Sequence, residues 1–320
     1  MFKRLQINRN DNHRNRAGGI VLLAAMVLVA VTGALAAGET FTIAPTYRSG
    51  EQLSYTWHLE NELSWSPAVK GSDWVKMTTD FDFVLDAKYP MEDGGCLFDL
   101  DGKRLESIGE SSKGKLGIRA TPTEVSYLLG KHWTKPGPAT PFAKPMTVTL
   151  GPQFQPTAST GVESIALFLL PGVDPRVWFV VTAAPAAPMT VGSSWTQDFD
   201  VEIPGATGDP LHVVVGINVV GTEKIDGADV LVIEAQGELN LVDSDIRMQD
   251  GKLLHIVHGR YEVTGTAKWD IDRGFLRFAT AAQTLKATAD RPETHRLASK
   301  AVSRLTLEEV RLPLSRSDSD

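Results

Sequence analysis

Residues 55–65 read Tyr-Thr-Trp-His-Leu-Glu-Asn-Glu-Leu-Ser-Trp, and this stretch decides the fold class. Apolar side chains occupy nearly every odd position, and polar side chains occupy every even one. Because successive side chains of a β-strand point to opposite faces, the alternation predicts a strand with one buried and one solvated face. Such strands are typical of antiparallel sheets, since strands of parallel sheets are usually buried on both faces.

Three further stretches, 75–87, 231–238 and 261–271, alternate in the same way. Several of these runs are longer than the five or six residues of an ordinary strand, and long strands with one apolar face curl. We therefore predict a mainly β protein: a large curved antiparallel sheet or open barrel, with two tandem β halves as the main variant and at least one short helix. The side chains predicted to share the inward face are Trp57, Leu59, Phe81, Phe83, Leu231, Ile233, Tyr261 and Val263.

Glycine-containing turns separate the predicted strands. Asp226-Gly227 and Asp272-Arg273-Gly274 lie between alternating runs, as hairpin turns do. Asp93-Gly94-Gly95 and Asp101-Gly102 predict further turns. The composition of residues 296–312 permits a helix, but its alternating leucines favour a final strand, which is our prediction.

Proline marks the expected boundary between the two β halves. Six prolines interrupt residues 133–158, and we interpret this stretch as a connection. The N-terminal β half then covers 37–132. A helix plus the C-terminal β half covers 159–314, and a polar tail covers 315–320.

The predicted helix lies just after this connection. Thr160 and Glu163 have the spacing of a capping box, apolar residues follow at helical intervals, and Pro171-Gly172 ends the run. We expect this helix to pack on the concave face of the sheet.

The first residues have the features of an export signal. Five basic residues precede an uncharged apolar run over residues 17–37, which ends in Ala34-Leu35-Ala36. This combination predicts a signal peptide over residues 1–36, cleaved near Ala36, and export to the periplasm or the extracellular space. The alternative is an uncleaved N-terminal membrane anchor, because the run is long enough to span a bilayer. The body lies outside the cytoplasm in both cases.

The composition limits the partners and the redox chemistry. The chain carries 32 Lys and Arg against 39 Asp and Glu, a net charge of −7. This balance argues against nucleic acid and against anionic membrane surfaces as partners. Cys96 is the sole cysteine, so the chain has no internal disulfide, and the residue is expected in the core.

No motif predicts catalysis, a cofactor or a metal. The sequence has no Gly-x-Ser-x-Gly nucleophile elbow. Gly109–Lys115 resembles a phosphate loop but is followed by leucine, so we predict no nucleotide. His255 and His258 are three apart, which on a strand places them on opposite faces. Asp99–Gly102 lacks the glycine position of a calcium loop and is interpreted as a turn.

Aromatic residues are the remaining candidates for a binding site. Large rings in strands with one apolar face form a core or line an apolar cavity. The candidate ligand-facing aromatics are Trp57, Trp65, Phe81, Phe83, Trp195 and Trp269.

A resemblance covers roughly residues 45–312. Residues 191–195 (Val-Gly-Ser-Ser-Trp), 259–267 (Gly-Arg-Tyr-Glu-Val-Thr-Gly-Thr-Ala) and 270–276 (Asp-Ile-Asp-Arg-Gly-Phe-Leu) carry it. In this pattern the chain resembles an exported bacterial all-β family of uncharacterised function. Its strand architecture is also similar to the LolA/LolB-like lipoprotein carriers. The second resemblance implies a curved sheet around an apolar cavity, and neither implies catalytic residues.

Three functional hypotheses follow. The first is a non-enzymatic cell-envelope protein that binds an apolar or lipid-like ligand, or an envelope protein partner, on a curved sheet. The second is a secreted hydrolase whose site is assembled from dispersed residues. The third is an outer-membrane β-barrel, which the polar C-terminus disfavours because it lacks a terminal aromatic residue.

Overall fold

The computed structural model describes residues 40–69, 72–162, 183, 188–201, 211–247, 253–289 and 295–313. All of them belong to one structural unit, residues 35–320. They form fourteen strands, and no helix occurs among them. The strands are β1 (Gln52–Val69), β2 (Ser72–Pro90), β3 (Cys96–Ser111), β4 (Gly114–Ala120), β5 (Val125–Leu129), β6 (His132–Trp133), β7 (Met146–Leu150), β8 (Pro156–Thr160), β9 (Ser194–Val201), β10 (Leu211–Ile225), β11 (Ala228–Arg247), β12 (Leu253–Asp270), β13 (Leu276–Ala289) and β14 (His295–Arg311).

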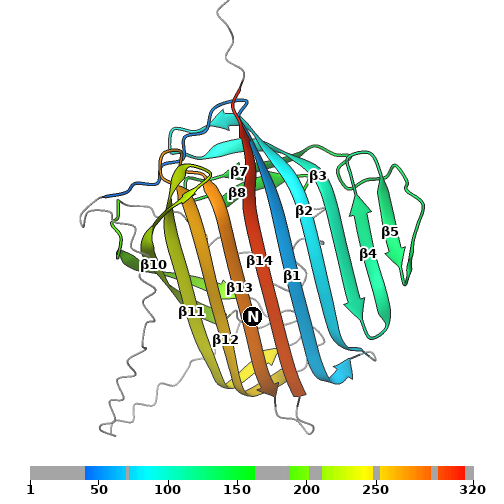
Figure 1. Cartoon of the computed structure of the whole chain (residues 1–320). Helices are drawn as coiled ribbons and strands as arrows, with labels where there is room; N and C mark the ends of the chain where they lie inside the picture. The colour runs from blue at the N-terminus through cyan, green and yellow to red at the C-terminus, as the bar shows by residue number, and fades with distance from the viewer. Residues whose placement is uncertain are drawn as a thin grey trace, which may run out of the picture. The chain divides into compact units, whose positions relative to one another are not determined.

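All fourteen strands belong to one antiparallel sheet (Figure 1). Its order is β6-β5-β4-β3-β2-β1-β14-β13-β12-β11-β10-β9, so the sheet is open, with β6 and β9 at its edges. The first and last strands pair with each other in the middle of the sheet. The predicted mainly β fold with a large antiparallel sheet is confirmed, and the β1–β14 pairing joins the strands from both ends of the sequence into a single sheet.

Strand β3 has two neighbours on the side away from β2. Its first residues, Cys96–Leu100, pair with β7, and its last residues, Leu105–Ser111, pair with β4. β7 in turn pairs with β8. The sheet therefore branches at β3, and the β7–β8 hairpin leaves the main row of strands.

The predicted turn at Asp101-Gly102 is wrong, because both residues lie inside β3 opposite Val84 and Phe83. The register shifts beside them, as at a β-bulge. The glycine has another cause. A Cβ at Gly102 would lie 2.5 Å from Cε1 of Phe142, so the close approach of that ring requires a residue without a side chain.

The other predicted turns and the final strand are present. Asp93–Gly95 and Asp272–Gly274 form turns, and Asp226-Gly227 connects β10 to β11 with positive φ at both residues, as a tight hairpin requires. The predicted final strand over residues 296–312 is confirmed, because β14 occupies this segment.

The face that carries the buried side chains is called the inner face below, and the opposite face the outer face. Of the eight side chains predicted to point inward, seven are buried, and six of these belong to one hydrophobic cluster. Leu59 is buried outside that cluster, and Trp57 is half-buried against it. The pleat therefore separates the faces as predicted. The seven are Leu59, Phe81, Phe83, Leu231, Ile233, Tyr261 and Val263.

Several predicted segments lie partly or wholly outside the described residues. The leader, 1–36, and the tail, 315–320, lie outside them entirely. Thr160, the expected helix cap, ends β8, and the rest of the predicted helix beyond Val162 is not described. The proline-rich stretch 133–158 contains β7 and the start of β8.

Candidate functional site

One end of the inner face is filled by aromatic rings. Phe81 stacks on Phe83 with ring centroids 4.9 Å apart, and Phe83 stacks on Tyr55 at 5.7 Å. Phe154, from the connection between β7 and β8, meets the edge of Trp269 at 5.9 Å and lies 6.2 Å from Tyr55. The β7–β8 hairpin thus closes this part of the inner face, and three of the candidate ligand-facing aromatics, Phe81, Phe83 and Trp269, are buried in its packing.

Two ion pairs hold the rim of this closed end. The Glu51 side chain is fully buried, and its Oε1 lies 2.6 Å from Nη2 of Arg273. Oδ2 of Asp270 lies 2.7 Å from Nη2 of Arg277, and this carboxylate is also buried. Burial raises the pKa of Tyr47 beside them well above its usual range, so its phenol stays protonated. The closed end is therefore a buried, largely aromatic region with ion pairs at its rim.

The middle of the inner face has a different character. By strand register, short side chains from six strands follow one another across the sheet, interrupted by Leu59. All of them are buried. We call this set the short-side-chain row; its members are Ser107, Thr79, Ser303, Ala281, Gly265 and Ala235.

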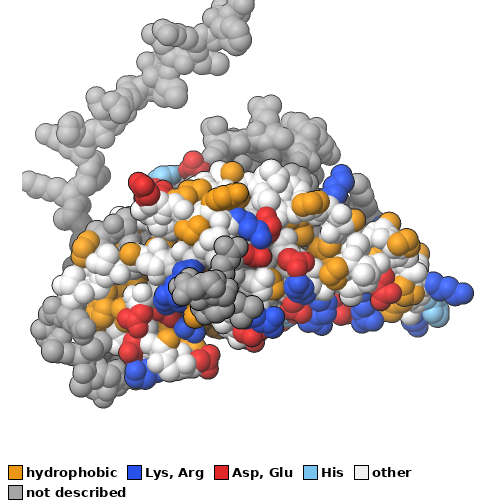
Figure 2. Space-filling model, turned by 90° about the horizontal axis from the view of Figure 1, so that it is seen from above, with side chains coloured by type: hydrophobic (Ala, Val, Ile, Leu, Met, Phe, Trp, Pro, Cys, Tyr) orange, Lys and Arg blue, Asp and Glu red, His pale blue; other side chains and the backbone are white. Residues whose placement is uncertain are grey.

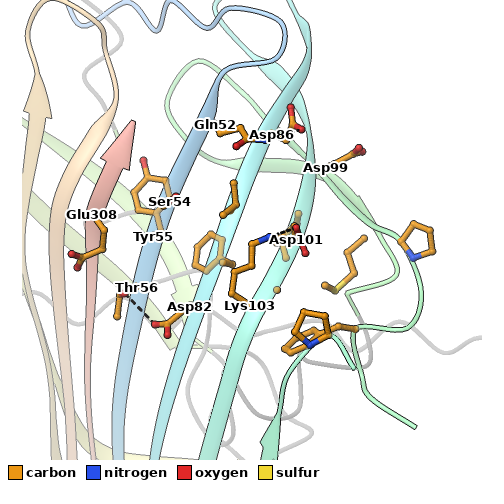
Figure 3. A pocket seen from close by; sticks show the side chains of 18 of the residues that line it. Gln52, Ser54, Tyr55, Thr56, Asp82, Asp86, Asp99, Asp101, Lys103 and Glu308 are labelled. Carbon is orange, nitrogen blue, oxygen red and sulfur yellow. Dashed lines mark hydrogen bonds and ion pairs between the residues drawn. The ribbon is translucent and has the colours of Figure 1, made fainter. Parts of the chain in front are cut away.

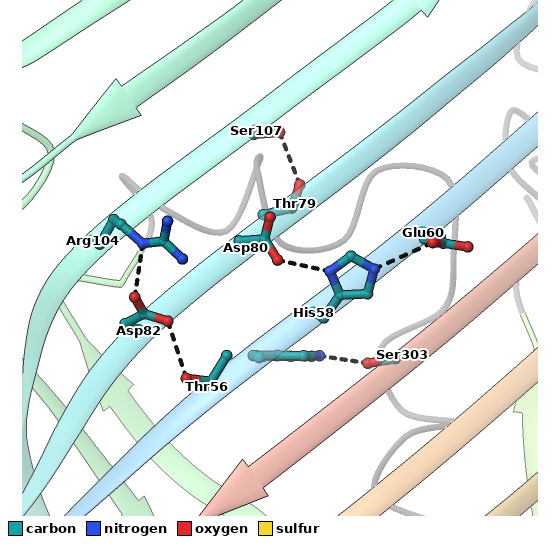
Figure 4. Close-up of polar contacts among 10 residues, drawn as sticks. Thr56, His58, Glu60, Thr79, Asp80, Asp82, Arg104, Ser107 and Ser303 are labelled. Carbon is teal, nitrogen blue, oxygen red and sulfur yellow. Dashed lines mark hydrogen bonds and ion pairs between the residues drawn. The ribbon is translucent and has the colours of Figure 1, made fainter. Parts of the chain in front are cut away.

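The hydroxyl groups of this row bond to neighbouring side chains. Thr79 Oγ1 and Ser107 Oγ lie 2.8 Å apart, and Trp57 Nε1 donates to Ser303 Oγ (Figure 4). Burying a hydroxyl group that is hydrogen-bonded lowers the stability of the fold little, whereas burying one without a partner lowers it by a few kcal/mol. These bonds make the row compatible with an apolar surrounding, and they place Trp57 beside it.

The remaining candidate aromatics lie elsewhere. Trp195 is the second residue of β9, opposite Ile217, and packs, partly buried, against the hydrophobic cluster. Trp65 lies on β1, but its side chain is outside the described part of the chain. The structure thus gathers Phe81, Phe83 and Trp269 at the closed end and keeps Trp195 apart from them.

The outer face carries a histidine held between two carboxylates (Figure 4). Nδ1 of His58 lies 2.7 Å from Oδ1 of Asp80, and its Nε2 lies 3.3 Å from Oε1 of Glu60. Partial burial by itself would lower the pKa of His58, but the hydrogen bonds and charges of the two carboxylates outweigh it and raise the pKa. The protonated imidazole can donate to both partners at once.

This arrangement predicts a pH-dependent contribution to stability. Because the pKa of His58 is higher in the folded protein, its contribution is fully present below the unfolded value of about 6.5 and is lost as pH rises through the folded pKa. In the wild-type protein the urea midpoint should therefore fall as pH rises above about 6.5, and in His58→Asn this fall should be smaller. Urea titrations of both proteins across this pH range measure it, and parallel curves would contradict the expectation.

A groove of about 720 Å³ lies on the outer side of β1, β2 and β3, beside the loop that contains Phe142 (Figure 3). Carboxylates and cations line it together with apolar side chains. Nε of Arg104 lies 2.8 Å from Oδ2 of Asp82, and the other carboxylate oxygen, Oδ1, accepts a hydrogen bond from Thr56 Oγ1 at 3.1 Å. The charged residues of the lining are Asp82, Asp86, Asp99, Asp101, Lys103, Lys144, Glu308 and Arg311.

The acids of this groove are mostly ion-paired. Lys88 Nζ lies 3.1 Å from Oδ2 of Asp86 and 3.2 Å from Oδ2 of Asp99, and Lys103 pairs with Asp101. General acid–base catalysis needs two carboxylates in different protonation states on either side of a substrate. Carboxylates held as ion-pair partners do not have that arrangement.

The histidines and the cysteine considered in the sequence are dispersed. His255 Nε2 lies 3.8 Å from Oδ1 of Asp243, and a register shift separates His255 from the exposed His258, so regular alternation does not apply between them. In the described ranges, no group of three His, Cys, Asp or Glu side chains could hold a metal ion. Burial raises the pKa of the Cys96 thiol to about 11, which leaves it protonated.

Sequence reasoning missed the short-side-chain row. Thr79 interrupts an otherwise apolar set of odd positions in its strand, which was the one available signal. Ser107 and Ser303 have no such signal, because only the pairing of distant strands brings them into line with Thr79.

No protein-family model matches the chain, and the search of curated proteins finds no match. Among solved structures, the chain is similar to one described as "Lipid-protein interactions in lipovitellin", at 8% sequence identity and a TM-score of 0.43. The match covers 86% of this chain and 27% of the lipovitellin chain. At these values the likeness carries no argument about function, and the resemblance to an exported bacterial family stays a prediction.

Among the described residues, no segment forms a helix long and apolar enough to cross a bilayer.

Proposed function

We propose that the protein is a non-enzymatic, exported binding protein that holds an apolar or lipid-like ligand against the inner face of its sheet. The short-side-chain row carries this proposal. At the closed end the inner face bears large rings, whereas the row bears only methyl groups, hydroxyls and a glycine. We infer that this row is the floor of a trough between larger neighbours, since apolar ligands bind in concave, mostly apolar sites.

The chemistry of the row favours an apolar ligand. Its hydroxyls are used in bonds to each other and to Trp57. Contact between this surface and hydrocarbon stabilises a complex by about 25 cal/mol per Å² of buried apolar surface. A polar ligand would find few hydrogen-bonding groups on it, because the hydroxyls are already hydrogen-bonded. An exported protein in an aqueous compartment would thereby shield an apolar molecule from water.

Two neighbouring alanines on β13 provide a matched test. Ala281 lies in the row on the inner face, and Ala282 lies on the outer face. We expect Ala281→Leu to fill the trough and to abolish lipid that co-purifies with the wild-type protein, measured by native mass spectrometry. Ala282→Leu adds the same volume on the other face and should leave the lipid signal unchanged.

Binding of a fluorescent fatty acid and thermal melting complete this test. Ala281→Leu should melt cooperatively and bind the probe at least tenfold more weakly, as expected when about 1.4 kcal/mol of binding free energy is lost. A wild-type protein that carries no lipid and does not bind the probe would refute the proposal. Equal probe binding by the two leucine variants would refute the row as the site.

A further inference from the structure

The hairpin formed by β4 and β5 exposes apolar side chains at the edge of the sheet. Leu116 and Leu129 are opposite each other across the two strands, and 65% and 61% of their surfaces are exposed. Tyr127 shares their face, two positions from Leu129, and is 47% exposed. The next residue on that face, Ile118, is buried in the hydrophobic cluster. The apolar inner face therefore extends past its buried part, and its last side chains on β4 and β5 are exposed to solvent.

Positive charge gathers around this exposed end. Residues 111–135 hold five Lys and Arg against a single acid, although the whole chain has a net charge of −7. Two of the five, Lys115 and Arg119, also form ion pairs with Glu110 and Glu106 of β3. Lys113 lies in the turn between β3 and β4, and Lys131 lies in the turn between β5 and β6. Gly130 N donates to the carbonyl oxygen of Lys115 at 2.9 Å, which brings the two turns to the same end of the hairpin.

Figure 2 views the molecule from above. At its right-hand end, which is the β4–β5 end of the sheet in Figure 1, hydrophobic side chains lie beside Lys, Arg and His side chains and a few acidic ones. An exposed apolar patch with a basic border stands out on a chain whose net charge is −7, and exposed apolar patches mark interaction sites.

We propose that this end of the β4–β5 hairpin docks on the surface of an anionic phospholipid bilayer. The two leucines would enter the boundary between head groups and acyl chains, with Tyr127 at head-group level, where tyrosine is favoured. The lysines of the adjoining turns would contact the lipid phosphates. The net charge of the whole chain predicts repulsion from such a membrane, but the local excess of Lys and Arg in residues 111–135 would face the bilayer in this orientation.

A fluorophore on the hairpin tests the docking in the full-length chain. Leu129→Cys is labelled with an environment-sensitive dye; Cys96 is buried and remains unlabelled. We expect the emission to brighten and shift to the blue with vesicles that contain phosphatidylglycerol, and to stay unchanged with vesicles of phosphatidylcholine alone. The same dye on Val242→Cys, an exposed position on β11, should respond to neither. This readout is local, so membrane contacts of other segments do not imitate it.

Matched charge variants test the basic border. Replacing Lys113, Lys115 and Lys131 by glutamine should weaken the response at position 129 on the order of a hundredfold in lipid concentration, since each basic residue near an anionic surface contributes about fivefold. The same change at Lys224, Lys286 and Lys300 removes equal charge from other strands and should have little effect.

Three results would overturn the proposal. The first is an equal response to vesicles with and without phosphatidylglycerol, and the second is a response unaffected by loss of the hairpin lysines. The third is a signal without vesicles that grows with protein concentration, which would make a second copy of the chain the occupant. The docking does not depend on a ligand in the inner face, so loss of fatty-acid binding leaves it standing.

Discussion

Phe81→Ala is expected to lower the free energy of unfolding by about 3–5 kcal/mol, as truncation of a large buried aromatic residue does. Only 1% of the Phe81 surface is exposed. Its ring lies between Phe83 at 4.9 Å and Phe142 at 6.0 Å, so alanine would leave a cavity inside the closed end. Urea unfolding of the variant and the wild type, followed by circular dichroism, measures the difference.

The adjacent residue provides the control. Asp82 points to the outer face and forms an ion pair with Arg104, whose side chain is more than half exposed. Exposed ion pairs contribute about 0–1 kcal/mol, so Asp82→Ala should shift the urea midpoint only slightly. If Asp82→Ala proves more damaging than Phe81→Ala, the inner and outer faces of β2 have been assigned the wrong way round.

Glu51→Leu is expected to cost about 3–5 kcal/mol, because removing one partner of a buried ion pair leaves the other charge without compensation. Glu51 is 0% exposed, and it accepts hydrogen bonds from both Arg273 and the backbone N–H of Arg48. Its loss would therefore remove the link between the start of β1 and the turn after β12. Thermal and urea unfolding measure the cost.

Two further variants separate burial from charge. Glu62 lies 3.2 Å from Lys76 on an exposed part of the outer face, and Glu62→Gln should change stability by about 0.5 kcal/mol or less. Adding Arg273→Met to Glu51→Leu should recover part of the loss, since no unpaired charge then remains. A Glu51→Leu protein as stable as Glu62→Gln would show that the buried pair contributes nothing.

The sequence was sufficient to predict the class of sheet and the facing of its strands. The facing follows from a local rule, the alternation of side chains, and it holds for residues as distant as Leu59 and Val263. The turn at Asp226-Gly227 also follows from a local rule. A two-residue hairpin turn needs positive φ at both positions, and Asp-Gly adopts this conformation readily.

What the sequence did not reveal depends on contacts between distant segments. Glycine occurs both in turns and where another group approaches the backbone closely, and the sequence around Gly102 does not distinguish the two. The ring that approaches it, Phe142, comes from a loop forty residues later. The short-side-chain row exists only once the register of six strands is set, and no single strand contains enough of it to be noticed. The excess of Lys and Arg in residues 111–135 is not visible in the net charge of the whole chain, which is −7.

The pairing of β1 with β14 sets the order in which the protein can assemble. During synthesis β1 is made long before β14, its partner in the sheet. Until β14 is available, β1 and β13 each have an unpaired edge at what becomes the centre of the sheet. Contacts between residues so far apart in sequence form slowly, and open strand edges invite pairing with other chains. Loss of β14 would thus divide the sheet in its middle. The interval between the arrival of the two strands is when this chain most needs protection from aggregation.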